Sequence, residues 1–456
     1  MRRQGACGSR SIRGARQGVL LLVAMALTGA SLTTVTASAA SVTGGGAAAR
    51  AAAASAPQLH VSGHKLVNAQ GARVVLHGVD RSGTEYMCVQ GNGIFDGPFH
   101  KASISAMKQW DVNAVRVPLN EACWNGESYV NSAFAGARYR DAIKSFVKLL
   151  NNNGLVAILD LHWTDGAYSG PGGGCTSAQA VCQKPMPDAA QAVGFWHSVA
   201  KTFKGNNAVI FDLFNEPFPE QADGGNSAEG WRCWLHGGSC AGISYKVAGM
   251  QSLVNAVRSA GAKNVLMLGG LEWSNDLTGW LSHKPKDPDH NLASSWHSYN
   301  FNACSTKSCW ISQVKPVIAK VPVIAGEIGE NDCADTYLHP LMRWLDSKQT
   351  SYLAWAWNAD FNCSSGPGLV TSYAGHPTGY GIGYRKHLRF LAKFHGPALF
   401  SVQPRRGTLD YRTGGKAFWT SIRTRPGTTG PPGTPVTGVN AETSQESFTV
   451  RWPRPR

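Results

Sequence analysis

The chain has 456 residues, of which 43% are hydrophobic and 16% are charged. This is the composition of a globular protein with enough apolar residues for a large core, which excludes a wholly disordered chain. The formal net charge is +15. We interpret this excess as a solvated surface, with attraction to anionic polymers such as cell-wall material or nucleic acid as the alternative.

Residues 1–39 have the pattern of a secretory signal peptide. Arginines precede the apolar run 19–27, and Ala37-Ser38-Ala39 then supplies small residues for cleavage. The apolar run is too short to span a bilayer, and a retained membrane anchor is the alternative. Residues 40–57 are rich in Ala, Gly and Ser, so we expect a flexible leader there. The sequence therefore predicts a secreted, extracellular protein.

Residues 58–396 are predicted to form one α/β domain. A β-hairpin at 59–78 comes first, and we expect it to close the bottom of a barrel. Apolar spacing at i, i+3, i+4 and i+7 indicates helices around 143–150, 250–257 and 338–345. Eight short apolar runs alternate with such segments: 74–78, 114–119, 156–161, 209–214, 265–268, 293–296, 321–325 and 352–355. This pattern predicts a parallel sheet buried on both faces, as a (β/α)8 TIM barrel, with a doubly wound open sheet as the alternative.

The composition changes after residue 396. Residues 397–425 are an extension of uncertain structure, and residues 426–438 are typical of a Pro/Gly/Thr linker. Residues 439–456 alternate like two strands and resemble the truncated start of a fibronectin type III module. Because a complete β-sandwich needs about 100 residues, we expect no folded second domain here.

Polar and aromatic residues recur where the apolar runs end. In a TIM barrel, catalytic groups lie at the carboxyl ends of the strands. Each residue taken alone is more often a surface, salt-bridge or packing residue. Together they predict an active site at one end of the barrel: Arg116, His162, Asn215, Glu216, His297, Tyr299, Glu327, Trp355 and Trp357.

Two of these residues, Glu216 and Glu327, indicate a specific chemistry. Paired carboxyl groups cleave glycosidic bonds. One donates a proton to the leaving oxygen, and the other, when the two carboxyl groups are about 5 Å apart, attacks the anomeric carbon. We expect the run 209–214 to fill the barrel interior, with Glu216 at its end. Burial and the nearby Glu327 charge then raise the pKa of Glu216. The alternative is that Glu216 is a structural carboxylate.

The motifs at the strand ends resemble those of glycoside hydrolase family 5, the cellulase family. They are NEP at 215–217, HSY at 297–299 and GEIG at 326–329, and the resemblance covers about residues 58–394. It implies that Glu216 is the general acid/base and that Glu327 is the nucleophile. It also implies that Arg116 and Tyr299 flank Glu327, hold it ionised and orient it.

The same resemblance implies substrate-binding roles for the remaining residues. Asn215 is expected to hydrogen-bond the sugar 2-hydroxyl. His162 and His297 are expected to line the subsite around the bond that breaks. Trp355 is expected to form the sugar platform, with Trp357 as the second candidate. The implied activity is a retaining endo-β-1,4-glucanase, while mannan, xylan and furanoside substrates stay open.

Cysteine usage agrees with export. Cys7 lies in the signal peptide, which leaves ten cysteines and no C-x-x-C pair, so we expect disulfides and no zinc site. Three pairs are close in sequence: Cys175 with Cys182, Cys233 with Cys240, and Cys304 with Cys309. Two further pairs follow neighbouring predicted strands, so we expect bridges that staple the βα loops: Cys88–Cys123 and Cys333–Cys363.

Loop residues extend the predicted site along a saccharide chain. We expect some of five aromatic residues to bind further sugar units, and two glutamates to bind hydroxyl groups: Trp124, Trp163, Tyr168, Trp273, Trp310, Glu85 and Glu121. The expected partner is a polysaccharide or oligosaccharide, bound by a monomer with no cofactor, no metal, no nucleic acid and no membrane. The rivals are a non-catalytic carbohydrate-binding protein and a metal-dependent hydrolase.

Overall fold

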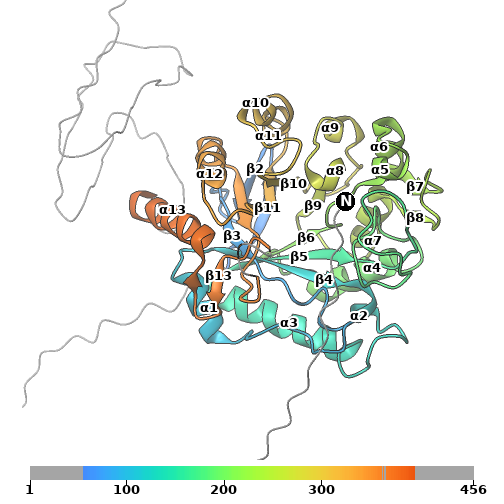
Figure 1. Ribbon diagram of the computed structural model, residues 1–456, viewed down its shortest axis with the longest axis horizontal. Coiled ribbons are helices and arrows are strands. Elements are labelled where there is room, and N and C mark those ends of the chain that lie inside the picture. Colours follow the sequence, from blue (N-terminus) through green and yellow to red (C-terminus); the bar gives the residue numbers. More distant parts are fainter. Residues whose placement is uncertain (1–54, 362, 364–365, 396–456) are drawn as a thin grey trace, which may run out of the picture. The chain divides into compact units, whose positions relative to one another are not determined.

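The computed structural model describes residues 55–361, 363 and 366–395 (Figure 1). The predicted signal peptide, most of the leader, and the extension, linker and fibronectin-like start lie outside the described residues. Within the described part, no helix is long and apolar enough to cross a bilayer.

Eight parallel strands close into a barrel in the order β10-β11-β12-β3-β4-β5-β6-β9 (Figure 1). Closure confirms the predicted TIM barrel and excludes the open sheet. The barrel strands are β3 (His77–Asp80), β4 (Ala114–Asn120), β5 (Val156–Trp163), β6 (Val209–Asp212), β9 (Leu266–Gly269), β10 (Leu292–Tyr299), β11 (Val323–Gly329) and β12 (Ser351–Ala354).

Helices surround the barrel, and the three predicted amphipathic stripes are confirmed in α3 (Ala137–Asn152), α7 (Met250–Ser259) and α12 (Leu338–Ser347). The other helices are α1 (Lys101–Lys108), α2 (Glu121–Asn125), α4 (Ala192–Phe203), α5 (Pro219–Ala222), α6 (Ser227–His236), α8 (Leu271–Ser274), α9 (Trp280–His283), α10 (Lys307–Cys309), η1 (Trp310–Val314), α11 (Lys315–Ile318) and α13 (Gly379–His395). Short antiparallel pairs lie in the loops: β7 (Gly237–Gly238) with β8 (Val247–Ala248), and β13 (Val370–Ser372) with β14 (His376–Pro377).

An N-terminal hairpin precedes the barrel, as predicted. Its strands β1 (Leu59–Ser62) and β2 (Lys65–Asn68) pair antiparallel. The predicted run 74–78 is divided between hairpin and barrel, because the Val74 N–H donates to Leu66 O at 2.9 Å and β3 begins only at His77. Val74 packs with Leu59 and Leu66 in a cluster that also contains interior strand residues. The hairpin therefore caps the apolar lower part of the barrel.

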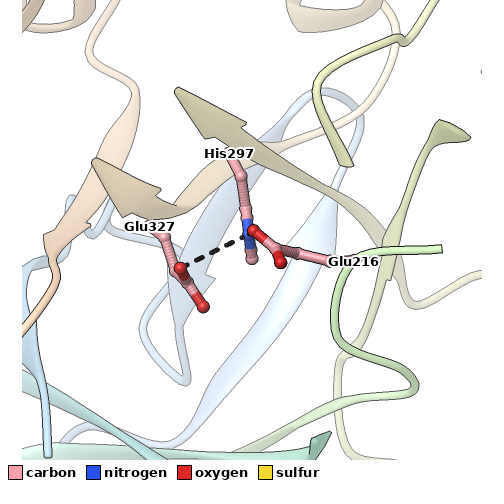
Figure 2. Close-up of side chains that lie close together, drawn as sticks. All are labelled: Glu216, His297 and Glu327. Carbon is pink, nitrogen blue, oxygen red and sulfur yellow. Dashed lines mark hydrogen bonds and ion pairs between the residues drawn. The ribbon is translucent and has the colours of Figure 1, made fainter. Parts of the chain in front are cut away.

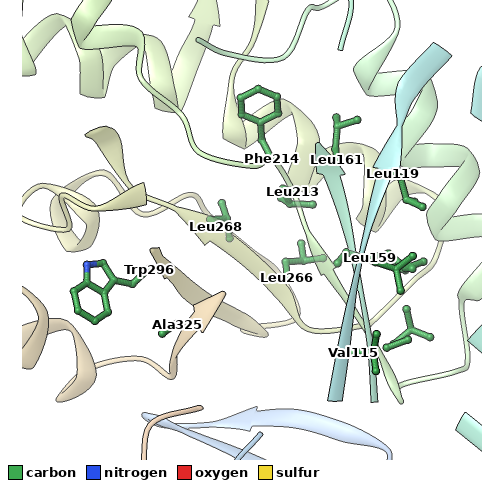
Figure 3. Packing of buried hydrophobic residues seen from close by; sticks show 14 of the residues in the cluster. Val115, Leu119, Leu159, Leu161, Leu213, Phe214, Leu266, Leu268, Trp296 and Ala325 are labelled. Atoms are coloured by element: carbon green, nitrogen blue, oxygen red, sulfur yellow. The ribbon is translucent and has the colours of Figure 1, made fainter. Parts of the chain in front are cut away.

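Two apolar clusters divide the strand side chains between the inside and the outside of the barrel. Val115 lies in the large cluster that joins strands to helices (Figure 3), whereas its neighbour Ala114 lies in the interior cluster. The expectation that run 209–214 fills the interior is therefore wrong for four of its six residues: Val209, Phe211, Leu213 and Phe214. Phe211 and Leu213 face the helices and Ile210 faces the interior, because side chains alternate along a strand.

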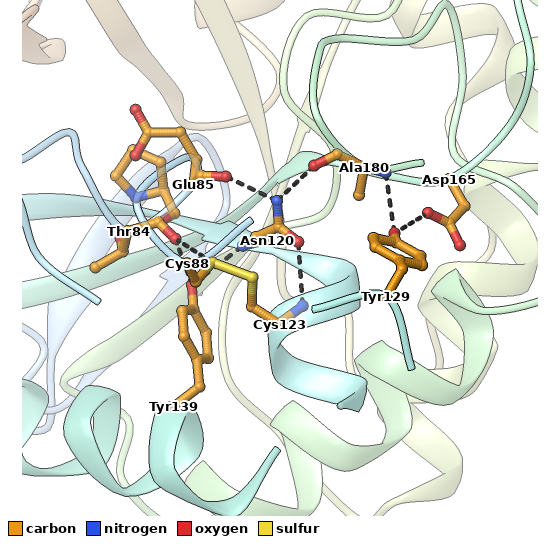
Figure 4. The surroundings of a disulfide bond; sticks show 10 residues. Thr84, Glu85, Cys88, Asn120, Cys123, Tyr129, Tyr139, Asp165 and Ala180 are labelled. Carbon is orange, nitrogen blue, oxygen red and sulfur yellow. Dashed lines mark hydrogen bonds between the residues drawn. A yellow bond between two sulfur atoms is a disulfide. The ribbon is translucent and has the colours of Figure 1, made fainter. Parts of the chain in front are cut away.

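Five disulfides staple the βα loops, and all five predicted pairs are confirmed. Cys88–Cys123 ties the loop after β3 to α2 (Figure 4). Beside it, Asn120 Nδ2 donates to Glu85 O and to Ala180 O, each at 2.7 Å. Covalent and hydrogen-bonded links therefore join three of the loops at the carboxyl end of the barrel.

Candidate active site

Arg116 is the buried cation around which the site is arranged. It lies on β4 with no exposed surface, and its guanidinium donates to Glu327 Oε1 and to the Asn215 side-chain oxygen, both at 2.8 Å. Burial lowers the pKa of a guanidinium, but nearby carboxylates outweigh burial and raise the pKa of Arg116 well above its ordinary value. Three of these carboxylates lie 3.2, 3.3 and 3.1 Å from it: Asp80, Asp160 and Asp212.

A β-bulge turns the Glu327 side chain into the barrel. Pairing of β10 with β11 passes from Trp296–Ala325 directly to His297–Glu327, so Gly326 is an extra residue. Ile324 packs inside, and strict alternation would point Glu327 outward. A Cβ on residue 326 would lie 2.8 Å from Ser295 Oγ and 2.9 Å from Met267 Cε, which explains the glycine. The turned carboxylate accepts a 2.5 Å hydrogen bond from the Tyr299 hydroxyl.

Glu216 follows β6 at a left-handed backbone position, with φ of 51°. Gln183 Nε2 donates to Glu216 O at 3.1 Å and to Glu216 Oε2 at 3.2 Å. Burial raises the pKa of Glu216 above its ordinary value, although His162, Gln183 and Arg116 oppose the shift. Glu216 therefore retains a proton to higher pH than an ordinary glutamate, as a general acid must.

His297 lies between the two glutamates (Figure 2). Its Nδ1 is 3.0 Å from Glu216 Oε1 and 3.7 Å from Glu327 Oε2. Burial lowers the pKa of His297 to about 4, despite the opposing charge of Glu327, so the ring is neutral near pH 7. One oxygen of each glutamate and one ring nitrogen of His297 all lie within 4.8 Å of one another. This separation resembles that of retaining glycosidases and is shorter than that of inverting ones.

The carboxylate pair opens into a cleft of about 630 Å³. Trp355 forms part of its wall and stacks on the His162 ring, with centroids 5.5 Å apart. Trp357 is fully buried and packs edge-on against Trp110. Of the two candidates for a sugar platform, Trp355 therefore reaches the cleft and Trp357 does not.

Of the nine residues predicted to form the active site, the structure brings eight together, and Trp357 is the exception. Arg116 and His297 are 0% and 1% exposed and contact the glutamates from below the cleft surface. The other six line the cleft itself: His162, Asn215, Glu216, Tyr299, Glu327 and Trp355.

Several of the loop residues considered for sugar binding do not line the cleft. Of the five loop aromatics, Trp273 lines the cleft. Trp124 and Trp310 are buried in the core between strands and helices, where each indole is held by its N–H hydrogen bond. Glu121 is fully buried, and burial with the nearby Asp188 charge raises its pKa well above the ordinary value. None of these three residues lines the cleft.

Sequence reasoning missed two groups of site residues. The aspartates around Arg116 had a signal, because Asp80, Asp160 and Asp212 each interrupt a buried strand and such a carboxylate needs a partner. The loop residues had no such signal in the sequence, because no periodic pattern predicts which loop residues line the cleft. They are Gln183, Glu272, Asn275, Phe301 and Asn302.

The three groups that could hold a cation within the described residues are Glu216, His297 and Glu327. Carboxylate and imidazole ligands suit a divalent transition metal. However, the Arg116 guanidinium already donates to Glu327 at 2.8 Å, and a fixed cation this close disfavours a second one. The arrangement fits paired acid and nucleophile chemistry better than metal ligation.

Comparison with known proteins identifies the family. A family model described as Cellulase (glycosyl hydrolase family 5) matches residues 67–361. The chain belongs to glycoside hydrolase family 5. This family 5 protein is therefore a glycoside hydrolase, and its relatives indicate a β-glycanase.

Those relatives divide between two polysaccharide classes. Beta-mannanase/endoglucanase A of Caldicellulosiruptor saccharolyticus is 23% identical over 293 residues, which are 62% of this chain but only 19% of that protein. Mannan endo-1,4-beta-mannosidase of Streptomyces lividans is 23% identical over 319 residues, 67% of each chain. A beta-glucanase of Saccharophagus degradans in complex with cellotetraose shares the fold with a TM-score of 0.56, at 17% identity over 74% of this chain and 95% of that one.

Proposed function

We propose that this family 5 enzyme is a secreted endo-β-1,4-glucanase that cleaves its substrate with retention of anomeric configuration. The observation that carries the proposal is the carboxylate pair within 4.8 Å. Glu216 has a raised pKa, whereas Glu327 accepts hydrogen bonds from Arg116 and Tyr299. Two carboxyl groups in unlike environments suit one acid and one nucleophile.

In the first step, a Glu327 oxygen attacks the anomeric carbon. The bond from that carbon to the leaving-group oxygen breaks, and Glu216 transfers its proton to that oxygen. The product is a glycosyl ester of Glu327. In the second step, Glu216 as carboxylate takes a proton from water, the water oxygen attacks the anomeric carbon, and the ester bond breaks. Two inversions at one carbon give net retention.

The surrounding residues have positioning and binding roles in this proposal. Arg116 and Tyr299 hold the attacking oxygens of Glu327 by hydrogen bonds of 2.8 and 2.5 Å. The Asn215 oxygen accepts from Arg116, so the Asn215 NH₂ is the donor that remains for a sugar hydroxyl. Trp355, stacked on His162, presents an indole to the apolar face of a pyranose ring.

A cleft lined by several aromatic residues favours a chain substrate. Trp273, Phe301 and Trp355 follow three different strands and line one cleft. An endo-acting enzyme needs contacts on both sides of the bond that it breaks, and in this proposal these residues supply them. The second candidate is a β-1,4-mannanase, which the relatives named as mannan-cleaving favour.

Secretion is supported independently of the cleft. Five disulfides join loops of the described residues, and disulfides persist in oxidising compartments outside the cytosol. The basic, apolar and small-residue pattern of residues 1–39 supplies a route to such a compartment.

The test is a substrate panel with purified wild type, Glu216→Gln and Glu327→Gln. The panel contains soluble β-1,4-glucan, β-1,4-mannan and β-1,4-xylan, with reducing ends and chain length measured. We expect glucan to be cleaved most efficiently, with a rapid fall in chain length, and both variants to be inactive on it. Faster cleavage of mannan would transfer the proposal to the second candidate. Unaltered activity of either variant would remove its basis.

A further inference from the structure

A second cavity, of about 720 Å³, lies at the other end of the barrel from the active site. Val61 of the hairpin, Leu292 at the start of β10 and Val321 just before β11 contribute to its lining. These positions are at the amino ends of the strands, whereas the two glutamates lie at the carboxyl ends. At about 3.3 Å per strand residue, Leu292 is about 17 Å from His297. The cavity is therefore separate from the cleft, and its volume is typical of ligand-binding pockets.

Three lysine side chains at this cavity have no partner in the described part of the chain. Lys284 and Lys286 lie in the segment before β10, and Lys320 lies just before β11. All three are exposed. Among the residues that the structure describes, no hydrogen bond or ion pair engages their ammonium groups. Their positive charges are therefore available to an anionic ligand.

The acidic residues of the same segment are both paired with Arg258. Asp287 is buried and accepts from Arg258 Nε at 2.7 Å and from Arg258 Nη2 at 3.0 Å. Asp289 Oδ2 lies 3.4 Å from Arg258 Nε. Because these carboxylates have a cation of their own, they neutralise the nearby lysines less than their number suggests.

Hydrogen bonds fix the segment that carries Lys284 and Lys286. The Lys286 N–H donates to Gln251 Oε1 at 2.8 Å, and Gln251 Nε2 donates to Lys286 O at 2.9 Å. Asn291 Oδ1 accepts from the Val61 N–H at 2.7 Å. These contacts hold the segment on α7 and on the hairpin. The backbone around the cavity is thus already ordered, which lowers the entropic cost of binding a ligand.

The side chains at the cavity suit a carboxylated sugar chain better than a nucleic acid. Val61, Leu292 and Val321 supply apolar surface that can pack on the C–H groups of sugar rings. Among the described residues that line the cavity, none is Trp, Tyr, Phe or Arg. Single-stranded nucleic acids are bound by aromatic side chains that stack on bases, and phosphate groups are recognised preferentially by the arginine fork.

The segments of this chain that lie outside the described residues do not match the charge of the cavity. Residues 40–54 contain no acidic residue. Residues 396–456 contain nine Lys and Arg residues but only three Asp and Glu residues. A basic segment is repelled by unpaired lysines, so charge complementarity favours a separate, anionic molecule.

We propose that this cavity is a second, non-catalytic binding site for a polysaccharide that carries uronate groups. The ammonium groups of Lys284, Lys286 and Lys320 pair with sugar carboxylates, and the apolar side chains pack on the sugar rings. A chain bound there holds the enzyme on an acidic polysaccharide, while the cleft at the other end of the barrel stays open to its own substrate.

The test measures the binding of oligogalacturonate, a sugar chain with one carboxylate on each unit, by calorimetry at low ionic strength. The cavity variant replaces three residues with glutamine: Lys284, Lys286 and Lys320. We expect its Kd to be about 10-fold or more above that of wild type, because charged contacts are lost. Lys320→Glu alone should weaken binding more than Lys320→Gln, because it introduces a repulsive charge.

A matched control variant removes the same charge elsewhere. It replaces exposed lysines on α1, α3 and α4 with glutamine: Lys101, Lys148 and Lys201. Both triple variants keep the basic residues of 396–456, so these contribute equally, and the control should keep nearly the wild-type Kd. No binding by wild type, or an equal loss in the two triple variants, would overturn the site. Tighter binding of a single-stranded polynucleotide that the cavity variant loses would also overturn it, because the ligand would then be a phosphate polymer.

Two further measurements complete the test. On wild-type protein, bound oligogalacturonate should protect Lys284, Lys286 and Lys320 from acetylation, as measured by mass spectrometry. Unchanged acetylation would contradict the proposal without any variant. The cavity variant should cleave soluble polysaccharide at the wild-type rate, and a slower rate would contradict a separate, non-catalytic site. Failure of wild type to cleave any polysaccharide would overturn the proposed function and leave the binding result standing.

Discussion

Arg116 on β4 donates a 2.8 Å hydrogen bond across the barrel interior to Glu327 on β11, 211 positions away in the sequence. These strands are not neighbours, because β3 and β12 lie between them. The bond therefore depends on closure of the barrel. The orientation of the proposed nucleophile, Glu327, therefore depends on the folded barrel.

Replacement of Arg116 is expected to reduce both stability and activity. Arg116→Met leaves buried carboxyl groups without their cation, and loss of one partner of a buried ion pair costs about 3–5 kcal/mol. The pKa of Asp212, already raised by burial to about 7, should rise further. We expect a matching fall in the free energy of unfolding by urea, and a loss of about 100-fold or more in kcat. Arg116→Lys keeps the positive charge and should lose less stability. Equal stability of the Met variant and wild type would contradict the role of Arg116 as the cation that stabilises the buried carboxylates.

Gln183 is expected to set the alkaline limit of activity. Burial raises the pKa of Glu216, and the hydrogen bond from Gln183 opposes that shift. Activity should fall as pH rises through the Glu216 pKa, because the proton donor is lost. Gln183→Ala removes this hydrogen bond, so the pKa of Glu216 should rise. The alkaline limb of the pH profile of kcat/KM should then shift by about 0.4–1 pH unit to higher pH. Gln179→Ala, at an exposed position of the same loop, is the control, and a downward shift for Gln183→Ala would contradict the prediction.

His162 is expected to make stability depend on pH. Burial lowers the pKa of His162, but Asp160 at 2.9 Å outweighs burial and raises it to about 9. The folded-state pKa lies above the ordinary value of 6.5, so the stabilisation is fully present below pH 6.5 and is lost as pH rises to 9. Its size is about 3 kcal/mol.

The measurement is urea unfolding at pH 6, 7.5 and 9 for wild type and His162→Gln. The variant should lack most of the fall in stability that wild type shows between pH 6.5 and 9. The exposed His100→Gln should keep that fall. An identical pH dependence in all three proteins would show that His162 does not carry the stabilising charge.

The disulfides should contribute unequally to stability. Cys88–Cys123 closes a separation of 35 residues and Cys304–Cys309 closes 5, and chain-entropy arguments give about 4 and about 2 kcal/mol respectively. Replacing both members of each pair with alanine should therefore lower the free energy of unfolding more for the first pair. A larger loss for Cys304 and Cys309 would show that loop closure in the unfolded chain is not the main effect.

The sequence predicts most of the fold, since apolar runs and helical stripes report burial directly. The limits of that reasoning appear in the run 209–214. A continuous apolar run does not say which face of a strand meets the helices, so Phe211 and Ile210 could not be separated from composition alone. The prediction of a barrel strand over residues 74–78 was wrong at its start for a related reason. Val74 is apolar whether it packs under the barrel or within it.

The candidate site was predictable where residues follow strands and not where they lie in long loops. Glu216 and Glu327 were found from their positions after apolar runs. Gln183 reaches Glu216 from a loop closed by Cys175–Cys182, and the sequence has no period that specifies this approach. The bulge at Gly326 could not be predicted either. One extra residue leaves the apolar composition of the strand unchanged, although it reverses the direction in which the Glu327 side chain points.

The central claim is that Glu216 and Glu327, with carboxylate oxygens within 4.8 Å, act by double displacement. Proton NMR of the first product formed from a β-1,4-glucan oligosaccharide, recorded before mutarotation, tests this claim most directly. The account predicts that the β-anomer appears first and the α-anomer follows as the sugar equilibrates. Initial formation of the α-anomer would mean inversion by a single displacement, and would contradict the account.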